Sequence, residues 1–171
     1  MTFLKQAALA AAAAATLLAA GAANAATWAW SYTGPGVTAA GTLTTAGNAL
    51  SPEAILSITG TRNGATILGL VPLGIDPNYE YDNEFTIGNP HFSEPGMLFD
   101  LGGGLDSSHV NLYYDLTTNN YVDLRINDVT GAVIDTNVTF NVSAVPEAAT
   151  YAYMALGLAG LGIAARRRKS A

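Results

Sequence analysis

Short runs of β-branched and aromatic residues, separated by Gly, Asn, Asp and Pro, fill residues 26–144. Many of these runs alternate polar with apolar residues, and none sustains the 3.6-residue period of an amphipathic helix. A period of two places successive side chains on opposite faces of a strand. The pattern therefore predicts an all-β domain whose strands each bury one face.

The first expected strand covers residues 28–32 and places Trp28, Trp30 and Tyr32 on one face. The other expected strands cover residues 37–45, 54–61, 65–70, 84–87, 97–101, 109–115, 121–127, 132–135 and 138–142. About ten strands in one domain of roughly 119 residues predict two packed antiparallel sheets, as in a β-sandwich or a jelly roll.

Two of the connections have the character of hairpin turns. Asn63-Gly64 lies between the runs 54–61 and 65–70, and both residue types tolerate the positive φ that a type I′ turn needs. A second hairpin is expected where residues 116–120 join the runs 109–115 and 121–127.

The N-terminal segment has the pattern of a secretory signal peptide. One cation precedes an apolar run over residues 7–20, and the small residues Ala23 and Ala25 form a cleavage pattern. We expect signal peptidase to remove residues 1–25, so that the mature chain begins at Ala26.

The C-terminal segment has three parts: residues 145–148, an uncharged apolar run over 149–165, and a basic cluster. As a helix the apolar run together with Ala148 would be roughly 27 Å long, which is close to the hydrocarbon thickness of a bilayer. Cations at its end favour the cytoplasmic side, which places the rest of the domain outside the cytoplasm. The alternative is a buried helix with a charged end. The basic cluster consists of Arg166, Arg167, Arg168 and Lys169.

This C-terminal arrangement resembles the PEP-CTERM sorting signal of Gram-negative bacteria. The resemblance lies in Val145-Pro146-Glu147, the glycine- and leucine-rich stretch 157–162, and the basic cluster 166–169. Ala148 stands where the family usually has a second proline. The resemblance implies recognition by an exosortase, a membrane peptidase that removes the tail, and a link to exopolysaccharide and biofilm.

The charge of the expected domain is strongly negative. Between residues 26 and 144 there are two arginines and twelve acidic residues, a formal charge of −10. Such a domain repels nucleic acid and attracts divalent cations. The chain has no cysteine, which excludes disulfides, thiol catalysis and thiolate metal sites.

An acidic segment over residues 76–84 is the best candidate site. Carboxylate and amide oxygens are the ligands that Ca²⁺ prefers, although the spacing is not that of an EF-hand loop. A solvated acidic loop is the alternative. Tyr79 and Tyr81 could stack on a sugar ring or cover the edge of the core. The predicted ligands are Asp76, Asn78, Glu80, Asp82 and Glu84.

The chain contains two histidines, His91 and His109, with serines nearby, but no nucleophile elbow and no zinc-binding helix motif. We therefore expect no enzyme. The predicted function is that of an exported envelope or matrix protein with a structural or adhesive role on glycan. The alternative is a secreted glycan-active enzyme on the same β-sandwich scaffold.

Overall fold

The computed structural model describes residues 25–102, 108–127 and 129–146. The predicted signal peptide up to residue 24, the transmembrane helix 149–165 and the basic cluster 166–169 lie outside the described residues, as does Glu147. No helix within the described ranges is long and apolar enough to cross a membrane.

The described residues form ten β-strands, and every strand pair among them is antiparallel, which confirms the predicted all-β fold. The strands are β1 (Ala26–Gly34), β2 (Val37–Thr45), β3 (Glu53–Arg62), β4 (Ala65–Thr66), β5 (Gly69–Leu70), β6 (Glu84–Phe85), β7 (Met97–Asp100), β8 (His109–Asp115), β9 (Asn120–Ile126) and β10 (Val133–Ala144).

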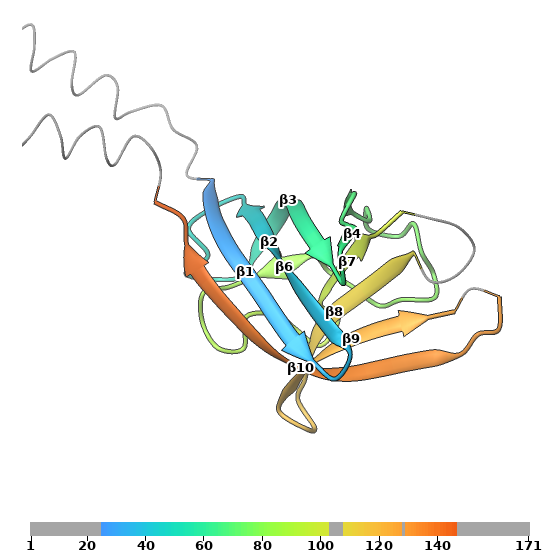
Figure 1. Ribbon diagram of the computed structural model, residues 1–171. Helices are drawn as coiled ribbons and strands as arrows, with labels where there is room; N and C mark the ends of the chain where they lie inside the picture. Colours follow the sequence, from blue (N-terminus) through green and yellow to red (C-terminus); the bar gives the residue numbers. More distant parts are fainter. Residues whose placement is uncertain (1–24, 103–107, 128, 147–171) are drawn as a thin grey trace, which may run out of the picture.

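The strands form two curved layers that share β10 (Figure 1). The strand order is β4-β3-β2-β1-β10-β9-β8-β7-β5, and the short β6 pairs with β3. Residues 133–138 of β10 pair with β9, whereas residues 139–144 pair with β1. A strand that passes from one layer to the other is the usual corner of a packed β-sandwich. The inner faces of the two layers therefore enclose the core.

Residues 65–71 join the two ends of this strand order. At the start of the segment β4 pairs with β3, and the Ile67 N–H donates to the Gly60 carbonyl over 2.9 Å. One residue later the Leu68 N–H donates to the Asp100 carbonyl over 2.7 Å, after which β5 pairs with β7. The curled sheet is thus closed by one extended segment that changes partners.

The core lies between the layers and is rich in aromatic residues. Trp28, Trp30 and Tyr32 are 4%, 3% and 0% exposed, which confirms the prediction that they share a buried face. Trp30 of β1 lies 6.5 Å from Phe99 of β7, centroid to centroid, so side chains of the two layers meet. Other large buried members include Leu43, Phe85, Phe92, Met97, Leu112 and Phe140.

A buried ion pair crosses this core. The Arg62 guanidinium of β3 donates to both carboxylate oxygens of Asp123 in β9, over 2.8 and 2.7 Å, and the Tyr32 hydroxyl of β1 donates to the same carboxylate over 2.6 Å. Burial raises the pKa of Tyr32 well above its ordinary value, and the charge of Asp123 adds to this. Burial lowers the pKa of Arg62, but its bonds to Asp123 outweigh burial and raise it. The three side chains link three strands from inside.

Both predicted hairpins are confirmed. Asn63 and Gly64 have φ of 49° and 83°, as a type I′ turn requires, and Arg62 pairs with Ala65 across it. The Asn63 side chain also accepts a bond from the Thr38 N–H over 2.8 Å. In the second hairpin Asp115 pairs with Asn120.

The division of the chain into strands differs from the expectation in two places, whereas the ends of the other expected strands lie within two residues of those in the structure. The expected strands 132–135 and 138–142 form the single strand β10, because Thr136 and Asn137 pair with β9 without a break. The expected strand 65–70 is divided into β4 and β5 because its pairing partner changes between Thr66 and Gly69.

The turn after β8 gives a pH-dependent prediction. Bonds from the Thr118 hydroxyl and the Thr117 N–H lower the pKa of Asp115 below its ordinary value of 3.8. A lowered pKa means that the turn is stabilised above about pH 4 and loses this contribution as pH falls through the folded value. We expect Thr118→Val to raise the Asp115 pKa toward 3.8, measured by NMR titration of the carboxyl carbon. An unchanged titration midpoint would contradict this.

Candidate functional site

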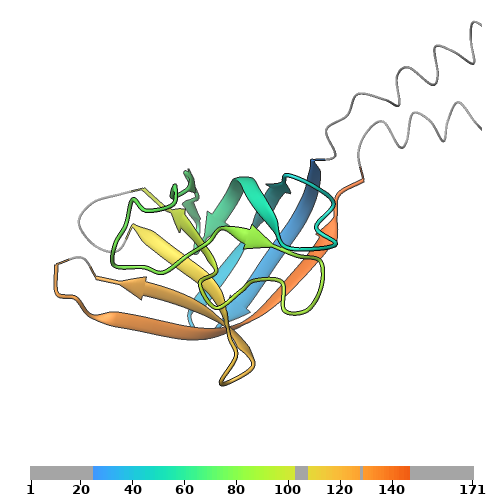
Figure 2. The ribbon, with the colours of Figure 1, turned by 180° about the vertical axis from the view of Figure 1, so that it is seen from behind.

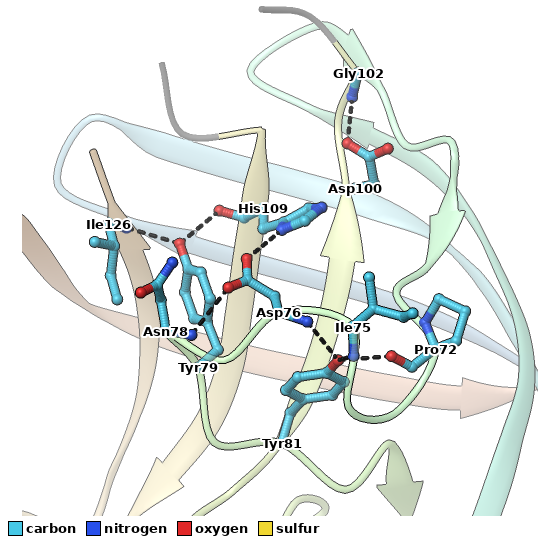
Figure 3. A network of polar contacts seen from close by, with 10 residues as sticks. All are labelled: Pro72, Ile75, Asp76, Asn78, Tyr79, Tyr81, Asp100, Gly102, His109 and Ile126. Atoms are coloured by element: carbon cyan, nitrogen blue, oxygen red, sulfur yellow. Dashed lines mark hydrogen bonds and ion pairs between the residues drawn. The ribbon is translucent and has the colours of Figure 1, made fainter. Parts of the chain in front are cut away.

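The predicted acidic segment lies across the outer surface of β8 and β9 (Figure 3). Val110 and Leu112 of β8 point into the main core, so the alternate residues His109 and Asn111 point toward this segment. The Asn111 amide donates to the Glu80 and Pro95 carbonyls, each over 2.8 Å. These bonds hold two loops against one strand.

Tyr79 fixes the segment to the sheet. It is 6% exposed and packs with Val71 and Leu98. Its hydroxyl donates to the His109 carbonyl over 3.1 Å and accepts from the Ile126 N–H over 2.7 Å (Figure 3). The last paired residues of β8 and β9 at this end are Asn111 and Leu124, so the hydroxyl bridges the strands where they separate. This environment favours the core-covering alternative for Tyr79 over stacking on a sugar.

Asp76 and His109 form a close pair. One carboxylate oxygen of Asp76 lies 2.6 Å from His109 Nδ1, and the other accepts from the Asn78 N–H over 3.0 Å. Their side chains are 10% and 24% exposed. The carboxylate orients the imidazole, as in many catalytic and metal-binding sites, and the contact is an ion pair when the histidine is protonated. An oriented imidazole alone does not make a reaction centre.

Tyr81 shapes the loop from its other side. Its hydroxyl donates to the Pro72 carbonyl over 2.6 Å and accepts from the backbone N–H groups of Ile75 and Asp76 over 3.2 and 3.4 Å (Figure 3). The hydroxyl therefore stabilises the conformation of the loop, and stacking of Tyr81 on a sugar stays a prediction.

The remaining predicted ligands are spread along the segment. Asp82 accepts bonds from the Ser93 hydroxyl and from the Glu84 N–H. Glu80 and Glu84 are exposed. Among the described residues no group of three or more His, Asp or Glu side chains is placed to hold a metal ion. Calcium binding by this segment stays a prediction.

Asn83 has a structural role that the sequence reasoning missed. It is 7% exposed and has a positive φ of 54°. Its side-chain amide donates to the Val71 carbonyl and accepts from the Leu98 N–H, both over 2.9 Å. Its backbone carbonyl accepts from the Ile55 N–H of β3 over 2.8 Å. One residue thus connects both layers of the domain.

The sequence reasoning also missed the contact of His109 with Asp76. The two residues are 33 positions apart, and only the path of the loop brings them together. A partial signal was present, because His109 alternates with the inward-facing Val110 and Leu112 and so had to point outward.

Removal of the Tyr79 hydroxyl will weaken the join between β8 and β9. In Tyr79→Phe the ring still fills its place, but the Ile126 N–H loses its acceptor. We expect amide hydrogen exchange at Ile126 to accelerate about fivefold, as for one lost hydrogen bond of about 1 kcal/mol. Exchange at Leu112 in the middle of β8 is the internal control. Equal exchange at Ile126 in both proteins would contradict the assigned bond.

The two ends of the domain leave it side by side. The start of β1 pairs with the end of β10, with Trp28 opposite Ala144, and the Val145 N–H donates to the Thr27 carbonyl over 2.9 Å. Figure 2 shows both ends of the coloured ribbon at the same corner. The predicted sorting motif therefore begins directly at the end of the last strand.

Comparison with known families supports that motif. Residues 144–169 match the model of the PEP-CTERM protein-sorting motif. No curated protein and no solved structure matches the chain. The matched residues include Val145-Pro146-Glu147 and the basic cluster 166–169, the same features on which the resemblance rests. Proteins with this motif are exported and processed at the membrane. The chain therefore carries a PEP-CTERM protein-sorting motif at residues 144–169, and this is the motif that an exosortase recognises.

Proposed function

We propose that the protein is a structural or adhesive component of the cell surface or extracellular matrix, associated with exopolysaccharide. The observation that carries the proposal is the position of the sorting motif, which follows β10 directly, at the corner where β1 begins. A domain held at one corner presents its remaining surface to the surroundings.

The electrostatics of the domain fit this role. Arg62 is buried and paired with Asp123, so it contributes little positive charge to the exterior. Nearly all the other charges are carboxylates, which keep the exported domain soluble and discourage self-association at low ionic strength. The same carboxylates repel acidic polysaccharides and nucleic acid, so the domain does not bind these polymers through its net charge.

The first experiment follows processing and location. We expect intact mass measurement to find a form in the surface or medium fraction that begins near Ala26 and ends close to Pro146. Replacement of Pro146 and Glu147 by alanine should leave the tail in place and the protein in the membrane fraction. Replacement of Thr117 and Thr118 by alanine is the matched control, because both residues lie on an exposed turn outside the sorting motif. Full-length protein found only in the inner membrane would contradict delivery to the exterior.

The second experiment addresses the glycan. We expect the exported protein to co-sediment with the producer's own extracellular polysaccharide without releasing reducing ends. Failure to co-sediment, with and without Ca²⁺, would contradict the adhesive role. Release of sugar that disappears in an Asp76→Asn variant would support the alternative, a glycan-active enzyme.

A further inference from the structure

The outer face of β1, β2, β3 and the second half of β10 is an uncharged surface rich in hydroxyl groups. Inward residues such as Trp30, Leu43 and Ile58 are buried, so their neighbours in sequence point outward. These outward residues, here called the hydroxyl face, are partly or fully exposed. They are Thr27, Ala29, Ser31, Thr33, Thr38, Ala40, Thr42, Thr44, Ser57, Thr59, Thr61, Thr139, Asn141 and Ser143.

Strand register places these side chains in rows that cross all four strands. One row runs from Asn141 through Ser31 and Ala40 to Thr61. With strands about 4.8 Å apart, such a row is about 14 Å long. In the next row the hydroxyls of Thr42 and Thr59 lie 2.9 Å apart and share a hydrogen bond. The face is therefore an ordered array and extends far enough to contact several units of a polymer. In Figure 1 its strands lie in front of β6, β7 and β8.

Two shallow hollows lie on the hydroxyl face. One, of about 210 Å³, lies between β1 and β10 and is lined by Ala29, Ser31 and Asn141, among others. The second, of about 270 Å³, reaches from β1 to β3 and is lined by Ser31, Ala40 and Thr61, among others. Both hollows include Ser31, so they follow one another along the same row.

We propose that the hydroxyl face binds a neutral polysaccharide chain that lies across the strands. Each Ser or Thr hydroxyl donates one hydrogen bond and accepts others, as sugar hydroxyls do, so the two surfaces can pair without moving any charge out of water. The proposal names the contact surface for the adhesive role proposed above and rests on it.

The composition of the face distinguishes this ligand from other partners. Centres of protein interfaces are enriched in aromatic residues, Met and Arg and depleted in Ser and Ala. None of the outward residues of the hydroxyl face is aromatic or Arg, and the two aromatic residues that also line the hollows, Trp30 and Tyr32, are buried. An acidic polymer would be repelled by the carboxylates elsewhere on the domain. A neutral polyhydroxyl chain is not repelled by the carboxylates and can form hydrogen bonds with a surface of Ser and Thr side chains.

The test is affinity electrophoresis of the exported protein through gels that contain hydroxyethylcellulose, a neutral probe, or alginate, an acidic probe. We expect hydroxyethylcellulose to retard the wild-type protein. Ser31→Glu and Ala40→Glu add bulk and charge where the hollows meet, and each should weaken this binding at least about tenfold. Ser51→Glu adds the same charge in an exposed loop outside the face and should leave binding unchanged.

A double variant tests the same surface without adding charge, in case Ser31→Glu or Ala40→Glu misfolds. Thr42→Val with Thr59→Val removes two hydroxyls but keeps β-branched side chains that suit a strand. We expect an unchanged melting temperature and binding weakened about three- to tenfold.

The outcomes separate the two proposals. If the wild-type protein binds neither probe nor the producer's polysaccharide, the adhesive function fails. If it binds a polysaccharide and every face variant binds equally well, the function stands and the hydroxyl face is the wrong surface. Preferential binding to alginate, or self-association that Ser31→Glu abolishes, would overturn the neutral glycan as the ligand.

Discussion

Replacement of Asp123 by alanine will lower the free energy of unfolding by about 3–5 kcal/mol, the usual cost of removing one partner from a buried ion pair. The guanidinium of Arg62 and the hydroxyl of Tyr32 would both stay in the core without their acceptor. Urea unfolding followed by the fluorescence of the buried tryptophans measures the loss. Asp135→Ala, an exposed acidic residue on the neighbouring β10, is the matched control and should change stability by less than about 1 kcal/mol.

A double variant shows whether the charge or the geometry matters. Arg62→Met with Asp123→Leu replaces the pair by apolar side chains and leaves only the Tyr32 hydroxyl to be satisfied. We expect it to be more stable than Asp123→Ala, because no unpaired charge is left in the core. If Asp123→Ala were no less stable than its control, the ion pair would contribute nothing to the fold.

Asn83→Ala will destabilise the domain by about 2–4 kcal/mol. The variant loses two buried hydrogen bonds, to Val71 and Leu98, and leaves both backbone groups without a partner. It also places alanine at a positive φ, which asparagine tolerates better. Urea unfolding again measures the effect.

Two further variants separate these causes. Asn83→Gly relieves the backbone but still lacks the amide, so it should recover less than about 1 kcal/mol of the loss. Asn119→Ala changes a residue with the same φ of 54° on an exposed turn, and should cost no more than about 1 kcal/mol. Full recovery in Asn83→Gly would mean that backbone conformation, and not the amide, explains the role of Asn83.

Strand positions could be predicted from the sequence because they depend on local alternation. The pattern from Trp28 to Tyr32 and the Asn63-Gly64 turn identify elements without reference to the rest of the chain. The path of residues 65–71 could not be predicted in the same way. Its residues suit a strand throughout, and the change of partner after Ile67 depends on where β7 lies.

The sequence contains an indication of the buried ion pair that the search for strands and turns did not use. Asp123 has the same parity as the core residue Tyr121, and Arg62 the same parity as the core residue Ile58. A charge at an inward position needs a partner, and few cations are present in the domain. In the acidic segment, composition alone did not show which side chains lie close together. The carboxylates are near one another in sequence, but in the structure Asp76 pairs with His109 and Asp82 accepts from Ser93.

The pairing of β1 with β10 has a mechanical consequence. A pull on the tail before its removal acts along β10, from its C-terminal end, while a ligand on the outer face resists through the neighbouring strands. The register from Trp28 opposite Ala144 to Thr33 opposite Thr139 then carries the load along the strand direction, so its hydrogen bonds are strained together and not opened one after another. The pairing of β1 with β10 therefore resists a force that acts along β10 while the outer face of the domain is held by a ligand.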